Sequence, residues 1–473
     1  MPEIQNCDIC IIGAGSAGLS VAAGAAQLGA RTILFERAEM GGDCLNYGCV
    51  PSKALLAAAH AAHDIREAKR FGIHASEPEI DFADVMAHVR DVIAAIAPHD
   101  SVDRFEGLGV RVVKAAARFT GPREVRGGGM QVRARRIVIA AGSAAAIPDI
   151  PGIATAAPLT NETIFSLTAL PEHLVIIGGG PIGVEMAQAF RRLGSRVTVL
   201  EARRILERDE PEFSEILRQR LTAEGIIIRE GARIDAVAKT ANGIALTLSG
   251  GAEQITGTHL LVAAGRRPRL DGLDLEKAGV ATTAKGITVD ARLRTSNSRI
   301  YAIGDIAGGP QFTHIASYHA GLVIRNALFR LPAKADYRAL PWVTYSDPEL
   351  AHVGLTEAQA RERHGNDVRI AHAAFDANDR ARAERDTTGA IKVITRANGT
   401  VLGASILGRG AGELLPIWGM TIARRMKLSA LTGIIFPYPT RSEIAKAAAS
   451  AFYSPKLFSR GPKLLVRVLS RLG

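Results

Sequence analysis

Two cysteines stand where a thiol can become reactive. Cys44 and Cys49 lie in a glycine-rich stretch, residues 41–53, and Pro51 marks the first turn of the helix expected to follow. A helix N-terminus lowers the pKa of a nearby thiol and so favours the thiolate, which is the nucleophilic form. Two structural thiols are the alternative, but this glycine-rich approach to a helix start favours a reactive pair.

The other two cysteines, Cys7 and Cys10, have the CxxC spacing of zinc sites and thioredoxin-like motifs. They fall inside an apolar run, residues 7–12, that predicts a buried strand. Residues three apart in a strand point to opposite faces of the sheet. We therefore expect two buried packing residues and no metal site.

Two glycine patterns indicate binding of dinucleotides. Both have the form GxGxxG, with glycines Gly13, Gly15 and Gly18 in one and Gly178, Gly180 and Gly183 in the other. Each follows an apolar strand, opens a helix and reaches an acid 23 residues after its first glycine, Glu36 or Glu201. The glycines make the turn, admit the pyrophosphate and let helix and strand pack, while the acid accepts hydrogen bonds from a ribose. The phosphates then sit at a helix N-terminus, which favours negative charge.

The acid of the second pattern bears on the choice of nicotinamide cofactor. Glu201 favours NADH, because a carboxylate there repels a 2′-phosphate. Arg203 and Arg204 lie just beyond it and could bind that phosphate. Both cofactors stay open, with NADH favoured.

The elements that must position these residues repeat along the chain. Strands are expected at 7–12, 31–35, 174–177, 196–200 and 391–394, and helices at 19–28, 51–68, 82–97 and 184–193. Three further apolar strands end at glycines, in Gly142-Ser143, Gly265 and Gly304-Asp305. The pattern predicts an α/β fold with two Rossmann-like dinucleotide-binding domains, the second inserted into the first, and a C-terminal domain.

Composition narrows the class of protein. The chain has 473 residues, of which 47% are hydrophobic and 22% charged, as in a globular protein with a sizeable core. It shows no apolar run of about 20 residues and no signal peptide, and four cysteines do not make a disulfide framework, so we expect a cytoplasmic protein. The net charge of +11 comes without a lysine-rich block, which favours anionic cofactors over nucleic acid.

Together these motifs resemble the class I pyridine nucleotide–disulfide oxidoreductases, the flavoprotein family of lipoamide dehydrogenase, glutathione reductase and mercuric reductase. The likeness covers about residues 5–455. It implies an FAD-binding domain at 1–150 and 271–340, an NAD(P)-binding domain at 151–270 and a C-terminal α+β dimerisation domain at 341–473. The implied FAD site comprises Gly13, Gly15, Gly18, Glu36, Gly42, Lys53, Gly142, Ser143, Gly304 and Asp305. The implied NAD(P) site comprises Gly178, Gly180, Gly183, Glu201 and Gly265.

The resemblance also implies a mechanism. Cys44 and Cys49 form a redox-active disulfide, in which Cys49 lies against the flavin and Cys44 meets the substrate. Lys53 lies beside the flavin, with Glu185 as its ion-pair partner. Electrons pass from NADH through FAD to the disulfide, and the resulting dithiol reduces an acceptor.

The C-terminal part departs from lipoamide dehydrogenase and glutathione reductase. Those enzymes use a histidine from the partner subunit as a base, with a glutamate five residues on. Here Tyr438 holds the histidine position and Glu443 the glutamate position. Tyrosine is a poor proton acceptor at pH 7.

Tyrosine at this position resembles mercuric reductase, although no cysteine follows Cys49 to supply that family's C-terminal cysteine pair. We expect a homodimeric, mercuric-reductase-like oxidoreductase with a metal ion, a quinone or a small disulfide as acceptor. A dihydrolipoyl dehydrogenase and a non-catalytic flavoprotein redox sensor are the alternatives.

Two pairs of histidines and the basic C-terminal segment are further candidate functional groups. His60 and His63, next to Asp64, have a spacing that can hold a metal, but a plain surface helix is the expectation. His314 and His319 could relay protons, although packing is favoured. Residues 454–473 carry five basic residues and no acid, and predict an amphipathic helix with Lys463, Arg467 and Arg471 opposite Leu465, Val468, Leu469 and Leu472. Such a helix can lie on an anionic membrane surface, although packing against the dimer is favoured.

Overall fold

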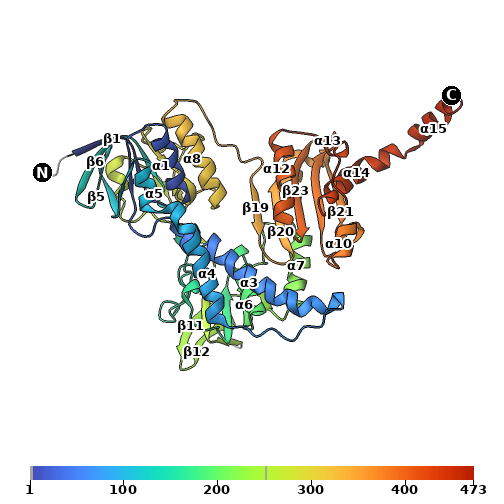
Figure 1. Cartoon of the computed structure of the whole chain (residues 1–473), viewed down its shortest axis with the longest axis horizontal. Coiled ribbons are helices and arrows are strands. Elements are labelled where there is room, and N and C mark those ends of the chain that lie inside the picture. Colours follow the sequence, from blue (N-terminus) through green and yellow to red (C-terminus); the bar gives the residue numbers. More distant parts are fainter. Residues whose placement is uncertain (1–3, 251–252, 473) are drawn as a thin grey trace.

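The computed structural model describes residues 4–250 and 253–472. Three lobes and a projecting C-terminal helix make up the molecule (Figure 1). The first lobe lies at the left of this view, the second below the centre and the C-terminal lobe at the right. This arrangement confirms the α/β fold with two dinucleotide-binding units and a C-terminal domain.

The first lobe is built on a sheet whose central strands are parallel. In order these are β3 (Val110–Val113), β2 (Thr32–Phe35), β1 (Ile4–Ile12) and β6 (Met130–Ile139), with β18 (Ile300–Ala302) beside β6. Antiparallel strands β5 (Glu124–Gly127) and β4 (Ala117–Gly121) extend the sheet. Helices α1 (Ser16–Gln27) and α8 (Thr313–Ala327) pack together in this lobe. The chain therefore returns to the first sheet only after residue 300.

The second lobe has a parallel sheet of four strands: β10 (Ile227–Glu230), β9 (Arg196–Glu201), β8 (His173–Ile177) and β14 (His259–Val262). An antiparallel sheet of β11 (Ile234–Thr240), β12 (Gly243–Leu248) and β13 (Gln254–Gly257) adjoins it. Helix α6 (Pro181–Arg192) follows β8, and α7 (Pro211–Ala223) follows β9. The long helices α3 (Cys49–Glu67) and α4 (Phe82–Ile96) pack here too, and their buried residues share one core with those of α6. The cysteine helix therefore joins the first and second lobes.

The C-terminal lobe is an antiparallel sheet covered by helices. Its strand order is β19 (Pro341–Thr344), β20 (Glu349–Gly354), β23 (Val401–Gly408), β22 (Ala390–Arg396) and β21 (Val368–Ala374). Helices α12 (Pro416–Ala423) and α14 (Glu443–Leu457) bury Trp418, Ile444 and Ala448 against it. Shorter elements used below are α2 (Gly42–Asn46), β7 (Ser143–Ala145), β15 (Arg266–Pro268), α9 (Glu357–His364) and α10 (Asp379–Ala383).

The first strand departs from the expected alternation. Cys7 and Cys10 are both fully buried, as expected, but they lie in the same hydrophobic cluster and not on opposite faces of the sheet. The backbone N–H groups of Asp8 and Ile9 both donate to Arg31 O, at 2.9 and 3.2 Å, which interrupts the alternation between the two cysteines. Burial raises the pKa of Cys7 to about 12, and both cysteines pack as apolar side chains within this cluster.

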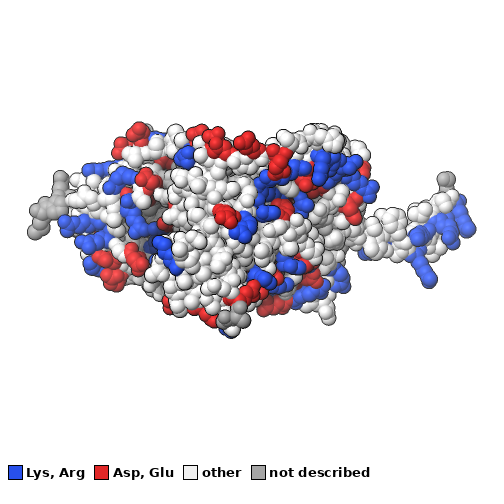
Figure 2. Space-filling model, turned by 90° about the horizontal axis from the view of Figure 1, so that it is seen from below, with Lys and Arg blue, Asp and Glu red and all other residues white. Residues whose placement is uncertain are grey.

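The chain ends in an exposed helix, α15 (Arg460–Leu469), that projects away from the C-terminal lobe (Figure 1). It is shorter than expected, so Arg471 and Leu472 lie beyond its end. Its apolar side chains are solvent-exposed, including Val466 at 65% and Leu469 at 55%. Figure 2 shows Lys and Arg side chains gathered on this arm. Among the described residues, no helix is both long enough and apolar enough to cross a membrane.

Candidate active site

The cysteine pair lies where two helices begin. Cys44 belongs to α2, Cys49 is the first residue of α3, and both are free thiols. Thr313, the first residue of α8, places its hydroxyl 3.1 Å from the Cys49 sulfur. Two helix N-termini therefore converge on Cys49, where each favours negative charge.

The two thiols differ strongly in acidity. A hydrogen bond from Cys44, together with Thr313 and the charge of Lys53, lowers the pKa of Cys49 to about 6, against the opposing effect of burial. The same hydrogen bond, together with burial, raises the pKa of Cys44. At neutral pH the pair is a Cys49 thiolate beside a Cys44 thiol. This is the division of roles that the sequence resemblance implies.

Lys53 is held at the meeting point of three parts of the chain. Its Nζ lies 2.8 Å from Glu185 Oε2, and Glu185, on α6, is only 4% exposed. The other oxygen of Glu185 accepts a hydrogen bond of 2.9 Å from the backbone of Tyr345. The Tyr345 ring lies under the ammonium group, 4.4 Å from Nζ to the ring centroid. The expected Lys53–Glu185 contact is present, and Tyr345 adds a contact that sequence reasoning missed.

The first glycine pattern leaves an open space at the start of α1. A Cβ on Gly13 would lie 2.4 Å from Ala140 O, and one on Gly18 would lie 1.8 Å from Gly13 O, so the turn and the helix contact both require glycine. A Cβ on Gly15 would meet only Gly42 Cα, at 3.9 Å. No side chain caps the α1 N-terminus, and its free N–H groups face this space. These features fit a bound pyrophosphate.

The carboxylate of Glu36 lies beside the same turn. It accepts hydrogen bonds from the backbone of Ala14, at 2.6 Å, and Ala38, at 2.7 Å. These contacts hold the acid at the end of β2, where a dinucleotide ribose is recognised.

Three strand ends meet at a second polar cluster. Ser143 Oγ donates to Asp305 Oδ2 at 2.5 Å and accepts from Arg266 Nε at 2.7 Å. Arg266 also lies 3.2 Å from Asp43, in the segment that carries Cys44. Burial raises the pKa of Asp305. The cluster joins Gly142-Ser143, the residue after Gly265, and Gly304-Asp305, and so brings together residues predicted for the FAD site. Arg266 was not among the predicted site residues.

The second glycine pattern repeats the first. A Cβ on Gly178 would lie 2.4 Å from Ala263 O, and one on Gly183 would lie 1.9 Å from Gly178 O, whereas one on Gly180 would meet nothing within 4 Å. Glu201 accepts hydrogen bonds from the backbone of Gly179, at 2.7 Å, and Arg203, at 3.0 Å. This open helix start with an acid beside it fits a second dinucleotide.

The arginines after Glu201 lie on the surface. The side chain of Arg203 pairs with Glu207 at 2.8 Å, and Arg204 is exposed. Glu201 is therefore the group fixed beside the turn, whereas the neighbouring cations are solvated.

Tyr438 and Glu443 lie on the C-terminal lobe. Tyr438 is 71% exposed, and its hydroxyl donates to Asp379 Oδ2 at 3.0 Å. Glu443 accepts from the backbone of Thr440 at 3.3 Å. The acid expected to orient residue 438 is therefore engaged elsewhere, and the tyrosine hydroxyl bonds to an acid that sequence reasoning missed.

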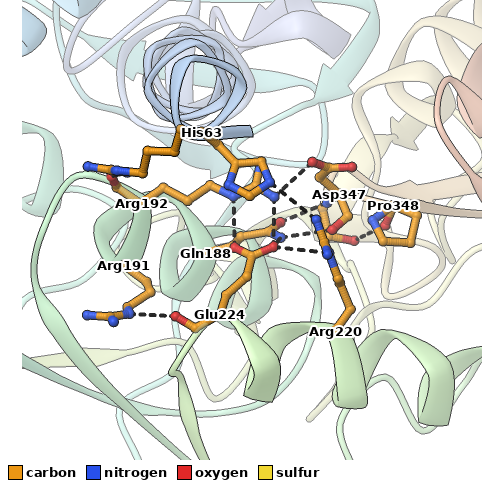
Figure 3. Close-up of polar contacts among 10 residues, drawn as sticks. His63, Gln188, Arg191, Arg192, Arg220, Glu224, Asp347 and Pro348 are labelled. Carbon is orange, nitrogen blue, oxygen red and sulfur yellow. Dashed lines mark hydrogen bonds and ion pairs between the residues drawn. The ribbon is translucent and has the colours of Figure 1, made fainter. Parts of the chain in front are cut away.

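The histidines of α3 are not on a plain surface, which corrects that expectation. His60 and His63 are half-buried against the second lobe, and burial lowers the pKa of both. Arg220 NH2 lies 3.2 Å from His63 Nε2 (Figure 3). These neighbouring arginines disfavour a cation between the two histidines.

The same region contains an ionic network that holds the segment after β19 in place (Figure 3). Arg192 is buried and pairs with Glu224 and with Asp347, each at 2.8 Å. Gln188 donates to Asp347 O at 2.9 Å and accepts from Asp347 N at 2.7 Å. Asp347 follows Tyr345 by two residues, so this network fixes the residue that covers Lys53.

His314 and His319 have packing roles. His314 Nε2 lies 2.9 Å from Pro341 O. His319 Nδ1 accepts from the Gly304 backbone at 3.2 Å, and burial lowers the pKa of His319 to about 4. His319 in its neutral form supports the Gly304-Asp305 turn through Nδ1.

A carboxylate trio with metal-ligand spacing occurs in the described part of the chain, formed by Glu210, Glu212 and Glu357. Lys392 Nζ lies among them, at 2.8, 2.5 and 2.6 Å respectively. The three acids raise the pKa of Lys392, which keeps it charged. The trio therefore holds an ammonium group that ties the second lobe to the C-terminal lobe.

The chain is similar to known proteins over most of its length. The family described as pyridine nucleotide-disulphide oxidoreductase matches residues 7–320, and its dimerisation domain matches residues 340–449. A mercuric reductase of Streptomyces lividans is 40% identical, covering 94% of this chain and 96% of its own. A dihydrolipoyl dehydrogenase of Geobacillus stearothermophilus is 36% identical, covering 93% and 94%. The Cu(II) complex of the HOCl-induced flavoprotein disulfide reductase RclA from Escherichia coli is 30% identical, with a TM-score of 0.84, covering 93% of this chain and 98% of that one.

Proposed function

Because this chain belongs to the pyridine nucleotide-disulphide oxidoreductase family, we propose that its cysteine pair passes electrons from NADH to a metal ion. The chain is an enzyme, an FAD-dependent and NAD(P)H-dependent disulfide oxidoreductase. Its dimerisation domain supports a homodimer. The proposal concerns the electron acceptor, a metal ion.

The observation that carries the proposal is an intact reactive cysteine pair in a chain that has a tyrosine at the position of the family's base. Cys49 is stabilised as a thiolate, while Tyr438 stands where a proton acceptor is needed to oxidise a dithiol substrate. The carboxylate of Asp379 raises the pKa of Tyr438 further, so this tyrosine is a still poorer base. Reduction of a metal ion delivers no proton to the acceptor, and so it does not depend on this missing group.

The reaction balances on the chain's own sulfurs. FAD, when bound, supplies the transfer of two electrons from NAD(P)H to the cysteine pair. Cys49 is already a thiolate, so only Cys44 loses a proton, which passes to solvent, as the S–S bond forms and two electrons leave the pair. One mercuric ion takes both electrons and becomes elemental mercury, or two cupric ions take one each and become cuprous.

Two similarities support a metal acceptor. Mercuric reductases from several bacteria are 34–40% identical to the chain over most of its length. A structural neighbour is a disulfide reductase described as a Cu(II) complex. A quinone or a small disulfide remains the second candidate.

The test is turnover of purified holoenzyme with NADH and a panel of mercuric ion, cupric ion, menadione and lipoamide. We expect metal turnover to exceed lipoamide turnover. Cys44→Ser should abolish metal turnover because no S–S bond can form, whereas Cys7→Ala, at a buried thiol outside the site, should retain it. Faster turnover of lipoamide than of either metal ion would contradict the proposal.

We also propose NADH as the preferred donor. Glu201 is fixed beside the turn, while Arg203 is paired with Glu207. An anaerobic titration with NADH, and in parallel with NADPH, should give more complete reduction with NADH at equal concentration. The reverse order would contradict this choice.

The exposed helix α15 has an uncovered surface that is available for a further contact. We propose that α15 lies on the anionic cytoplasmic face of a membrane, because its apolar side chains are uncovered and residues 454–473 contain five basic groups and no acid. Sedimentation with anionic liposomes should carry the full chain down and leave a chain stopped at Tyr453 in solution. Equal sedimentation of both would end this proposal in favour of packing within the dimer.

A further inference from the structure

The residue at the histidine position is held by a helix that the sequence pattern did not connect with it. Asn378 caps α10 and is only 7% exposed. Its side-chain nitrogen donates to Thr440 O at 3.0 Å, which ties the start of α10 to the 438–440 segment. The next residue, Asp379, receives the hydroxyl of Tyr438 at 3.0 Å. Two successive residues of one helix start therefore fix Tyr438.

Four other charged groups of this region have ion-pair partners. Arg380 pairs with Glu384, and Arg441 pairs with Glu384 and with Asp386 at 3.1 Å. Glu443 accepts from the Thr440 backbone. Within residues 4–250 and 253–472, no ion pair involves Asp379. Its negative charge is therefore directed to Tyr438 and to whatever approaches it.

We propose that Asp379 is a positioning residue that holds Tyr438 as a neutral phenol, with its oxygen lone pairs directed to a cationic electron acceptor. The inference rests on the proposed function for the class of acceptor. A phenol has one proton and two lone pairs. Because the proton is bound by Asp379, the lone pairs are what Tyr438 can offer, and they attract a metal cation.

The first test needs no acceptor. Ultraviolet difference titration of the wild type against Tyr438→Phe isolates the ionisation of Tyr438 among the seven tyrosines. The charged groups that face its hydroxyl are Asp379 and, at longer range, Glu443, and both raise its pKa. We expect Asp379→Asn to lower this pKa towards the ordinary value, because a carboxylate acceptor is replaced by a neutral amide. The matched control is Asp376→Asn, which removes the same charge from an exposed position of the same segment.

The second test compares a cation with an uncharged acceptor in the holoenzyme. Asp379→Asn should raise the KM for cupric ion about threefold, the size of a surface charge effect, with a smaller change in kcat. The KM for menadione should not change, and Asp376→Asn should change neither. Tyr438→Phe combined with Asp379→Asn should be no worse for cupric ion than the worse single variant.

The outcomes separate the two proposals. If the wild type reduces neither mercuric nor cupric ion, the proposed function fails whatever the titration shows. If Asp379→Asn leaves the Tyr438 titration unmoved, the positioning role of Asp379 is overturned even when metal turnover is high. If the titration shifts but the cupric KM does not, the preference for a cation is overturned.

Discussion

The two sulfurs of this site differ in acidity, and the hydrogen bond between them contributes most to the difference. The Cys44 thiol donates to Cys49, so one sulfur becomes the stable thiolate and the other keeps its proton. The charge of Lys53 favours the thiolate at Cys49, and the Thr313 hydroxyl lies 3.1 Å from the Cys49 sulfur. The asymmetry needed for stepwise electron transfer is therefore present in the structure of the pair itself.

Replacing Thr313 by valine tests this asymmetry. The shape is nearly kept and the hydroxyl is lost, so the pKa of Cys49 should rise from about 6. The thiolate exists above the pKa and is lost below it, so the variant should carry less thiolate at pH 7. Thiolate absorbance at 240 nm against pH, with Cys49→Ser subtracted, measures this. An unchanged midpoint would show that Cys44 and Lys53 suffice.

Replacing Tyr438 by histidine tests the missing base. Histidine titrates near pH 6.5, and general-base catalysis contributes roughly a hundredfold or more. We expect dihydrolipoamide oxidation to rise by about tenfold or more, because Glu443 remains bound to Thr440 and orients the new ring incompletely. Steady-state assays with lipoamide give the answer. An unchanged rate would remove proton abstraction as the missing step.

Sequence reasoning recovered the residues that belong to motifs and missed those that meet only in the fold. Cys44, Cys49 and Lys53 carry their own local signal. Thr313 and Tyr345 carry none, because each reaches the site from an element more than 250 residues along the chain from the cysteines. Contacts of this kind are set by how helices and lobes pack, which local pattern does not encode.

At the scale of elements, the two glycine turns are alike in which glycine positions have room for a side chain and which do not. The third glycine of each packs on the carbonyl of the first, whereas a Cβ on the second would meet only Gly42 Cα, at 3.9 Å, in the first turn and nothing within 4 Å in the second. One class of glycine therefore serves the fold and the other serves the ligand.

Two substitutions in the second turn should separate these roles. Gly180→Val adds a side chain where no atom lies within 4 Å, so the fold should be kept while the KM for NADH rises by about tenfold or more. Gly183→Ala places a Cβ 1.9 Å from Gly178 O and should destabilise the protein by about 1–3 kcal/mol. Thermal unfolding and NADH kinetics on both variants measure the contrast. Similar losses of stability in both would contradict it.

The strands and helices around these turns follow the sequence pattern within a few residues, because apolar runs and glycine turns are local signals. The exception is β1, where one carbonyl, Arg31 O, accepts from two successive N–H groups. The contact with this carbonyl, which lies just before β2, cannot be predicted from the spacing of Cys7 and Cys10. Helix α15 is a second exception, because it ends at Leu469 although the amphipathic pattern in the sequence runs on to Leu472.

At the scale of the whole molecule, buried charges tie the lobes together. Lys392 of the C-terminal lobe meets Glu210 and Glu212 of the second, and Arg192 meets Asp347. The sequence predicts the lobes but not these contacts, since none of the residues stands in a recognisable motif.

Lys392→Met should show what the first of these ties contributes. It leaves carboxylates unpaired beside the fully buried Glu210, and losing one partner of a buried ion pair costs about 3–5 kcal/mol. Because the remaining acids can take up protons, the deficit should shrink as the pH falls. Urea unfolding at several pH values measures it, with the exposed Lys334→Met as control. A deficit that does not depend on pH would point to lost packing and not to unpaired charge.

Helix α6 begins at the second glycine turn and two residues after Gly183 carries Glu185, the partner of Lys53. A nucleotide seated on this helix start and a charge change at the cysteine pair therefore act on the same rigid turn. Such coupling is reciprocal: whatever factor the reduced pair applies to nucleotide affinity, the nucleotide applies to the equilibrium between dithiol and disulfide. Each tenfold in that factor displaces the midpoint potential of the two-electron couple by about 30 mV. We therefore expect the driving force of the enzyme to depend on which form of its nicotinamide cofactor is bound.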